Sequence, residues 1–304
     1  MSRFHSYINS SKRIVDGYDA EHPFPIHLKK QFSANKQIGS RDRKMIAEIC
    51  YAWFRTSHLF NRNLQDQNIV NAIFLCAQNE HPLLAALAPE LNELVALPVP
   101  EKFAHLNLNP ANLFPFKDAL GAIESEPFFL SFLSQPLLFL RMRPGMEKVV
   151  IEKLKDHQSS FTQIGFACVA LPNATKLEEV IALNKEAVVQ DYSSQQVFNF
   201  LEQTNLDQGN KIVWDCCAAS GGKSILVHDK LSGKIHLTVS DIRGTIMHNC
   251  KQRLQEAGVP IEHSFVTDVA SELSQKLPAD FSIIICDVPC TGSGTWSRTP
   301  EQLA

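Results

Sequence analysis

Three observations on the sequence predict an α/β fold with a doubly wound parallel sheet in the C-terminal third. Four short apolar segments occur in series, at 211–216, 236–241, 264–268 and 281–287. Stretches with helical periodicity, at 222–231 and 244–257, separate the first three segments. Each segment also ends in or next to an aspartate. Strands that alternate with helices are typical of βαβ units, whose parallel sheets bind ligands outside the carboxyl ends of the strands.

The preceding residues predict a helical bundle followed by a small α+β module. Apolar residues recur at helical spacing after Ser40, which is placed to cap that helix, and further helical stretches follow near 68–78 and 82–94. From about 137 the pattern changes to strand candidates at 137–142 and 166–171, with a helical stretch at 149–158 between them. We therefore expect three domains, at 1–125, 135–195 and 196–304.

Composition excludes several classes of protein. The 304 residues are 20% charged and 44% hydrophobic, which is typical of globular chains and not of collagenous or disordered ones. The N-terminus lacks a secretory signal, and the eight cysteines contain no C-x-x-C pair, so we expect reduced thiols and no metal site. The most apolar stretch, 128–140, is shorter than the roughly 20 residues of a membrane span. The sequence predicts a cytoplasmic protein without a membrane partner.

Charge is distributed unevenly along the chain. Residues 1–62 contain 11 Lys and Arg against 5 Asp and Glu, whereas the remaining residues contain 18 against 27. Arg41, Arg43 and Lys44 lie in the first turns of a predicted helix, where positive charge opposes the helix dipole. The basic segment is therefore a candidate footprint for a polyanion, and the alternative is an ordinary solvated helical surface.

The loop after the first strand, D-C-C-A-A-S-G-G-K-S at 215–224, is rich in small residues and leads into a helix. A phosphate-binding P-loop requires glycine where Cys217 stands, and the G-x-G-x-x-G dinucleotide fingerprint is absent. The remaining interpretations are a loop that holds the methionine end of S-adenosylmethionine and a tight strand-to-helix turn without a ligand.

Two aspartates end the second and third strands. Asp241 lies about 20 residues beyond the glycines, where a carboxylate accepts hydrogen bonds from ribose hydroxyls in nucleotide-binding folds. Asp268 is placed to meet an adenine amino group. Each could instead be a turn residue, but acidic strand ends in this order around one crevice favour a ligand.

The segment after the fourth strand, C-D-V-P-C-T-G-S-G-T at 286–295, combines a thiol, a carboxylate and glycines. A thiolate that adds to carbon 6 of a cytosine makes carbon 5 nucleophilic towards a methyl group. A carboxylate such as Asp287 can bind the N3/N4 edge of the base, and Gly292 and Gly294 allow close approach to a flipped base. The alternative for Cys290 is a buried loop thiol.

These segments resemble the Sun/RsmB-type S-adenosylmethionine-dependent RNA cytosine-5 methyltransferases. The loop at 215–223 is similar to D-x-C-A-A-P-G-G-K of that family, and 287–294 is similar to D-A-P-C-S-G-x-G. The V-Q-D-Y-S-S-Q segment at 189–195 resembles V-Q-D-x-S-S-Q, and Arg141 lies in a segment similar to L-R-x-N, with Arg143 at the asparagine position. The resemblance implies a Rossmann-like methyltransferase domain at 196–304, an RRM-like module at 135–195 and a helical RNA-binding domain at 1–125.

The resemblance also implies roles for individual residues. Asp241 would hold the ribose, Asp268 would lie near the adenine, and Asp287 would lie at the junction of cofactor and target cytosine. Cys290 would be the cysteine that assists breakdown of the covalent adduct, next to Asp287 as the second catalytic residue. The S-adenosylmethionine pocket would be lined by Cys217, Ala218, Ala219, Ser220, Gly221, Gly222 and Lys223, with Asp241, Asp268 and Asp287.

Two departures from the family pattern qualify this interpretation. Ser220 replaces the usual proline, which we expect to loosen the loop, and the nucleophile-bearing T-C-S segment is absent before Ala304. We therefore expect a chain that is truncated before the nucleophile and severely impaired in transferring methyl groups to RNA, ribosomal RNA being favoured over transfer RNA. The alternatives are a nucleophilic Cys290, as in DNA cytosine methyltransferases, and a non-catalytic RNA-binding protein with a vestigial cofactor loop. We expect a monomer.

Overall fold

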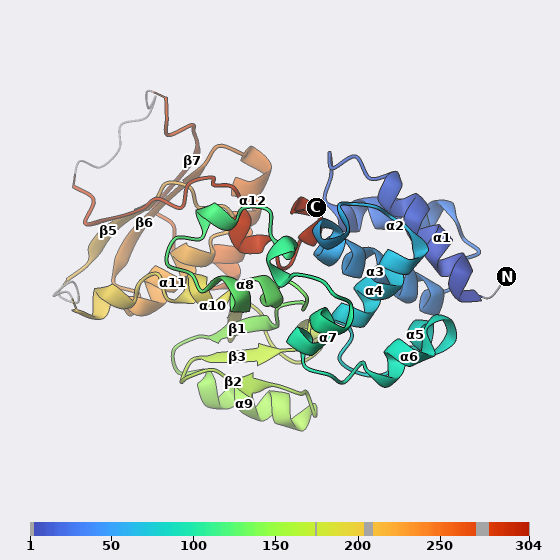
Figure 1. Cartoon of the computed structure of the whole chain (residues 1–304). Coiled ribbons are helices and arrows are strands. Elements are labelled where there is room, and N and C mark those ends of the chain that lie inside the picture. The colour runs from blue at the N-terminus through green and yellow to red at the C-terminus, as the bar shows by residue number, and fades with distance from the viewer. Residues whose placement is uncertain (1–2, 174, 204–208, 272–279, 304) are drawn as a thin grey trace. The chain divides into compact units, whose positions relative to one another are not determined.

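The computed structural model describes residues 3–173, 175–203, 209–271 and 280–303 (Figure 1). The chain forms two compact units. The first comprises Met1–Pro136 together with Thr291–Ala304, and the second comprises Leu137–Cys290. We refer to them as the helical unit and the α/β unit. None of the helices in the described ranges combines the length and apolar character needed to cross a bilayer.

The helical unit is built on amphipathic helices around one apolar core. Its described α-helices are α1 (Arg3–Asp16), α2 (Phe24–Ala34), α3 (Ser40–Thr56), α4 (Asp66–Cys76), α5 (Pro82–Leu87), α6 (Pro89–Glu93), α7 (Val99–His105) and α8 (Ser125–Ser131). Phe24, Ile49 and Phe74 are fully buried in this core. The stretch predicted at 82–94 forms two short helices, because Pro89 begins the second one.

The helix predicted from Ser40 differs at its first residue. Ser40 is already helical, and Gly39 is the N-cap, whose amide donates to Asp42 Oδ2 at 3.3 Å. The predicted capping role of Ser40 is therefore wrong by one position. Asp42 supplies the negative charge that the positive end of the helix favours, which offsets the basic residues of the first turns.

The segment 291–304 belongs to the helical unit. The Trp296 ring lies 6.1 Å from that of Phe114 and 5.6 Å from that of Phe116. The His58 ring nitrogen Nε2 lies 2.8 Å from the Leu303 carbonyl oxygen. The division into three domains stays a prediction, but these contacts place the last described residues with the first 136, whereas we had expected them with the parallel sheet.

The first sheet of the α/β unit is antiparallel, in the order β2-β3-β1-β4. Its strands are β1 (Leu138–Met142), β2 (Thr162–Gln163), β3 (Cys168–Leu171) and β4 (Ala187–Val189), with helix α9 (Glu147–Asp156) between β1 and β2. Val150 and Leu154 of α9 are buried against Leu140 and Val169 of the sheet. The sequence pattern predicted this helix and two of the strands, whereas β2 is too short to leave a periodic signal.

The second sheet is parallel, in the order β7-β6-β5-β8 among the described strands. Its elements are β5 (Lys211–Asp215), α11 (Gly222–Lys230), β6 (Ile235–Asp241), α12 (Gly244–Glu256), β7 (His263–Val266) and β8 (Ile283–Ile285). This arrangement confirms the predicted Rossmann-like, doubly wound α/β fold. Because β5 lies between β6 and β8, the loop after β5 begins where the carboxyl ends of all three strands meet.

Candidate functional site

A cavity of about 220 Å³ lies at the carboxyl end of β5. Its wall is formed by the loop after β5, the first turn of α11, the second residue after β8, the segment that follows β4, and one residue of α12 (Gly244–Glu256). The lining residues are Val189, Gln190, Asp191, Ser194, Asp215, Cys217, Ala218, Ala219, Ser220, Gly222, Lys223, Arg253 and Asp287. Seven of the ten predicted cofactor-binding residues are in this set; Gly221, Asp241 and Asp268 are not. We refer to it as the β5 cavity.

Asp215 is the buried charge of the β5 cavity. Its carboxylate accepts a hydrogen bond from Ser224 Oγ at 2.6 Å through Oδ2, whereas Oδ1 is buried without a hydrogen-bond partner among the described residues. Burial raises the pKa of Asp215 to about 6, because removal from water disfavours the charged form. A buried carboxylate with an unused oxygen is suited to a positively charged ligand, since an unpaired buried acceptor is costly.

The loop after β5 depends on two left-handed residues. Ala219 has a φ of 46°, and Gly221 has a φ of 79° at the start of α11. A Cβ atom on Gly221 would meet Cys250 Sγ at 3.1 Å and Leu254 Cγ at 3.3 Å. Gly221 therefore turns the chain and allows α12 to pack closely, while its neighbours line the cavity.

Ser220 stands where the resembling family has proline, and Arg253 of α12 binds it. Arg253 Nη1 donates to Ser220 Oγ at 2.8 Å and to the Ser220 carbonyl at 3.3 Å, while Nε donates to Asn184 Oδ1 at 2.9 Å. Hydrogen bonds from Arg253 therefore hold the loop at the position where the resembling family has a proline ring, and the expected looseness of the loop stays a prediction. The sequence did not predict this role of Arg253, because the sequence pattern of a helix does not indicate which distant loop one of its side chains will contact.

The Lys223 ammonium group and the Asp287 carboxylate form an ion pair across the β5 cavity. Lys223 belongs to the first turn of α11, and Asp287 follows β8, which pairs with β5. The Asp287 side chain is 52% exposed, so the pair remains accessible to a ligand. The structure thus brings together two residues that the sequence separates by more than 60 positions, while their roles stay predictions.

Asp241 lies beside the β5 cavity, but both of its carboxylate oxygens already accept hydrogen bonds from neighbouring residues. Its Oδ2 accepts from the Ala219 amide at 3.0 Å, and Oδ1 accepts from the amide and Nε of Arg243, each at 3.0 Å. These hydrogen bonds, with that of the Arg243 side chain the largest, lower the pKa of Asp241. The Arg243 side chain is 58% exposed, so it can leave without disturbing the core.

Asp268 is exposed and makes a local turn. Its carboxylate accepts from the Ala270 amide at 2.9 Å and from Ser271 Oγ at 3.4 Å. This is the turn interpretation that the sequence left open. A role at an adenine stays a prediction.

The cysteines near the β5 cavity differ in their environments. Burial raises the pKa of Cys216 to about 12, and burial also raises the pKa of the lining Cys217. Cys290 is exposed and ends the α/β unit, where the chain continues as Thr291 of the helical unit. The eight cysteines all lie in the described part of the chain and form no disulfide. Cys217 thus suits a wall position better than a nucleophile, whereas the catalytic role of Cys290 stays a prediction.

Gln190 connects the β5 cavity to a buried ionic network that the sequence did not reveal. Arg141 Nε donates to Gln190 Oε1 at 2.9 Å, and Arg141 Nη1 donates to Asp229 Oδ2 at 2.6 Å. Arg143 Nη2 donates to Asp229 Oδ1 at 2.6 Å. Although burial raises the pKa of Asp229, the His228 ring at 3.7 Å and the hydrogen bonds from both arginines lower it to about 2. Arg143, which departs from the family asparagine, is therefore an integral part of this network.

The β5 cavity fits one end of S-adenosylmethionine better than the other. The unused oxygen of Asp215 and the small residues of the loop suit the cationic methionine portion, since a side-chain cradle is already in place. The ribose carboxylate, Asp241, would first have to lose Arg243. The described residues thus offer a cradle for the methionine portion, whereas a ribose at Asp241 would require that one exposed side chain to move.

Comparison with known proteins places the chain near methyltransferases. Over 119 residues it is 29% identical to "Probable ribosomal RNA small subunit methyltransferase B" of Bacillus subtilis strain 168, covering 39% of this chain and 26% of that protein. Over 188 residues it is 27% identical to "Putative methyltransferase Rv1407" of Mycobacterium tuberculosis strain H37Rv, covering 61% of this chain and 40% of that protein. No protein-family model matches the chain.

A solved structure extends the likeness to the fold. PH0851 superimposes with a TM-score of 0.61 at 16% sequence identity, over 99% of this chain and 78% of that one. At this identity the match concerns the fold alone. The chain is thus a relative of proteins named as methyltransferases and spans less than half the length of those sequence relatives.

Proposed function

We propose that the chain binds S-adenosylmethionine in the β5 cavity and belongs to an enzyme that methylates carbon 5 of a cytosine in RNA. The observation that carries this proposal is the buried, half-satisfied carboxylate of Asp215 beside the Lys223–Asp287 pair. The similarity to methyltransferases and the Rossmann-like sheet support it. Ribosomal RNA is the favoured substrate, because the B. subtilis relative carries that substrate in its name.

Each predicted residue has a role in this proposal. The bound cofactor would supply an electrophilic methyl group. Asp215 would bind the positively charged part of the cofactor, Asp287 would bind the amino edge of the cytosine, and Lys223 would hold the Asp287 carboxylate in position through their ion pair. Cys290 would assist breakdown of the covalent adduct. A base would remove the carbon-5 proton, the electron pair of that C–H bond would re-form the C5–C6 double bond, and the C6–S bond would break to release the attacking cysteine as its thiolate.

Calorimetry with S-adenosylmethionine tests the first part of the proposal. We expect binding by the wild-type chain and at least about a tenfold loss in Asp215→Asn, because the neutral amide cannot pair with a cation. Asp156→Asn, which changes an exposed aspartate of α9, is the matched control. Equal affinity in the wild type and Asp215→Asn would contradict the assignment of the cavity.

The role of Cys290 is tested by trapping with RNA that contains 5-fluorocytosine. We expect no covalent link to Cys290, because the resemblance assigns nucleophilic attack to another cysteine. Peptide mapping that finds RNA on Cys290 would instead support the alternative in which this thiol is the nucleophile, as in DNA cytosine methyltransferases.

A non-catalytic RNA-binding protein is the second candidate. The observation that favours it is the closure of Asp241 by Arg243 and the Ala219 amide, which leaves a predicted ribose ligand engaged. That candidate predicts salt-dependent RNA binding without measurable affinity for S-adenosylmethionine. The same calorimetric titration therefore separates the two functions.

A further inference from the structure

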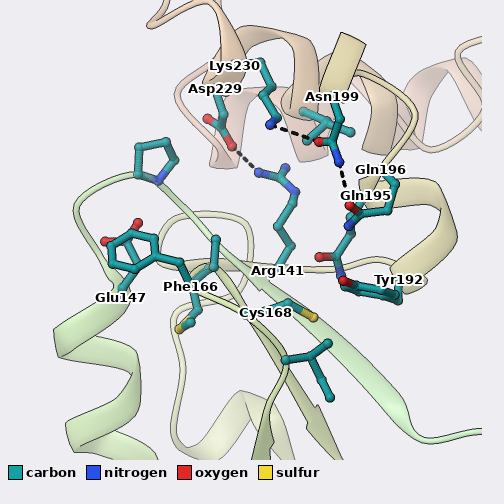
Figure 2. Close-up of a pocket in the computed structure, with 16 residues that line it drawn as sticks. Arg141, Glu147, Phe166, Cys168, Tyr192, Gln195, Gln196, Asn199, Asp229 and Lys230 are labelled. Atoms are coloured by element: carbon teal, nitrogen blue, oxygen red, sulfur yellow. Dashed lines mark hydrogen bonds and ion pairs between the residues drawn. The ribbon is translucent and has the colours of Figure 1, made fainter. Parts of the chain in front are cut away.

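A second cavity of the α/β unit, of about 350 Å³, shares no lining residue with the β5 cavity. Its walls come from β1, the loop between β2 and β3, the segment 192–199 and helix α11 (Figure 2). We refer to it as the Arg141 cavity. The methyl-transfer proposal leaves it unused, although it is larger than the β5 cavity.

A buried guanidinium group forms the floor of the Arg141 cavity. The Arg141 side chain is 7% exposed, and its Nη2 has no hydrogen-bond partner within the ranges that the structure describes. Arg141 and Arg143 share one carboxylate, Asp229, so the network carries two positive charges against one negative charge. A hydrogen-bond acceptor on a ligand would satisfy the remaining donor, whose burial is otherwise costly.

Two aromatic side chains border the Arg141 cavity. Phe166 is 77% exposed, near Gly165, whose φ of 69° makes the tight turn between β2 and β3. Tyr192 is 39% exposed. Figure 2 shows the two rings on opposite sides of Arg141. Such exposed rings contribute little to the core, but they are the type of surface on which nucleobases stack.

The polar side chains that line the Arg141 cavity can form hydrogen bonds with both donor and acceptor groups of a ligand. Lys230 Nζ donates to Asn199 Oδ1 at 3.1 Å, and Asn199 Nδ2 donates to Gln196 Oε1 at 2.6 Å. This series of hydrogen bonds orients the Gln196 side chain so that its amide nitrogen can donate to a ligand. Glu147 lies near Phe166 and supplies a carboxylate acceptor (Figure 2). A ligand that carries amino groups as well as carbonyl or phosphate oxygens matches this set.

We propose that the Arg141 cavity binds one nucleotide of single-stranded RNA, outside the target base, with its base against Phe166 and an acceptor atom towards Arg141. A free phosphate would use neither the aromatic rings nor Glu147, and an apolar ligand would leave the guanidinium group unsatisfied. This inference depends on the proposed function only in taking RNA as the polymer. Arg141 is also bonded to Gln190, so the nucleotide would lie one side chain away from the β5 cavity.

The test measures the affinity of the full chain for a short fluorescein-labelled single-stranded RNA by anisotropy. We expect Phe166→Ala to weaken binding about 5- to 100-fold, because stacking on the ring is lost. The salt dependence should stay unchanged, since no phosphate contact is removed. Gln196→Ala should weaken binding less. Phe200→Ala is the matched control, because that ring is 56% exposed and does not line the cavity.

Saturation-transfer NMR with cytidine and guanosine monophosphates provides the second measurement. Transfer to the base protons that Phe166→Ala abolishes would support the proposal, and competition by inorganic phosphate alone would overturn it. RNA affinity equal in the wild type and Phe166→Ala would also overturn it. Binding of S-adenosylmethionine, measured on the same preparations, tests the proposed function separately, so either inference can fail while the other stands.

Discussion

The two units provide different hydrogen-bond partners for their buried cationic side chains. In the helical unit, Lys102 is 2% exposed, and its ammonium group donates to the carbonyls of Phe74 at 3.0 Å and Ala77 at 2.5 Å. In the α/β unit, Arg141 is bound by Asp229 and Gln190, yet Nη2 lacks a partner among the described residues. Backbone carbonyls thus satisfy Lys102 within the fold, whereas the Nη2 donor of Arg141 beside a cavity is the observation on which the proposed nucleotide site depends.

The largest effect that would sharpen this comparison is expected from Asp229→Ala. Removing the carboxylate leaves Arg141 and Arg143 as two buried guanidinium groups without a counter-charge. We expect a loss of about 3–5 kcal/mol in the free energy of unfolding, measured by urea denaturation. Asp156→Ala, at an exposed position, should change stability by less than about 0.5 kcal/mol. A loss of unfolding free energy no larger than that of the control would show that hydrogen bonds to carbonyls and Gln190 suffice to stabilise the two arginines.

The pH dependence of the same pair has a definite sign. The folded-state pKa of Asp229 is about 2, below its ordinary value near 4. The carboxylate therefore contributes stability above about pH 4, and this contribution is lost as the pH falls towards 2. Asp229→Ala should reduce the loss of stability on acidification, relative to the wild type.

Lys102→Met is expected to have the next largest effect. The apolar side chain has a similar shape but leaves the carbonyls of Phe74 and Ala77 with one donor fewer, so we expect about 2–3 kcal/mol of destabilisation. Binding of RNA mononucleotides should not change. Lys30→Met, at an exposed position of α2, is the matched control. A change in nucleotide binding would contradict the assignment of Lys102 to the fold alone.

Asp215→Asn should have a smaller effect on stability, of the opposite sign. Because the folded-state pKa of Asp215 is about 6, the native state retains a proton that the unfolded chain releases above about pH 4. The wild type therefore loses stability between about pH 4 and 6, and the variant should lack this loss. We expect Asp215→Asn to be about 1–2 kcal/mol more stable at pH 7 and to bind S-adenosylmethionine more weakly. Thermal denaturation across this pH range checks the first expectation, and a variant less stable than the wild type would contradict it.

The smallest effect is expected from Arg243→Gln. The Arg243 side chain is 58% exposed although Asp241 is buried, so we assign their ion pair the value of a surface pair, about 0.2–1 kcal/mol. Release of Asp241 should then tighten S-adenosylmethionine binding by at most about fivefold. Calorimetry compares it with Lys251→Gln, which changes another cation of α12. Weaker binding in Arg243→Gln would indicate that Arg243 itself holds the cofactor.

Local patterns predicted most of the α/β fold. The parallel strands each coincide with a predicted apolar segment, although Val266 of β7 and Ile284 of β8 are more than half exposed. Boundaries moved by at most two residues, as at both ends of β8, which forms three residues where seven were predicted. The pattern could not assign 291–304 to the helical unit, because the contacts of Trp296 and His58 bridge more than 150 positions.

The sequence by itself determined which residues could carry the chemistry. The small-residue loop and Asp287 were identified from residue types and spacing, because close approach of backbone to ligand requires small residues wherever the chain folds. The place of Lys223 in the pocket came from the family resemblance. Only the tertiary structure decided which of them meet. It joined Lys223 to Asp287, closed Asp241 with Arg243, and left Asp215 Oδ1 and Arg141 Nη2 beside cavities. Whether a buried polar atom has a hydrogen-bond partner depends on residues from elements that are distant in the sequence, and a local sequence pattern does not predict which residues these are.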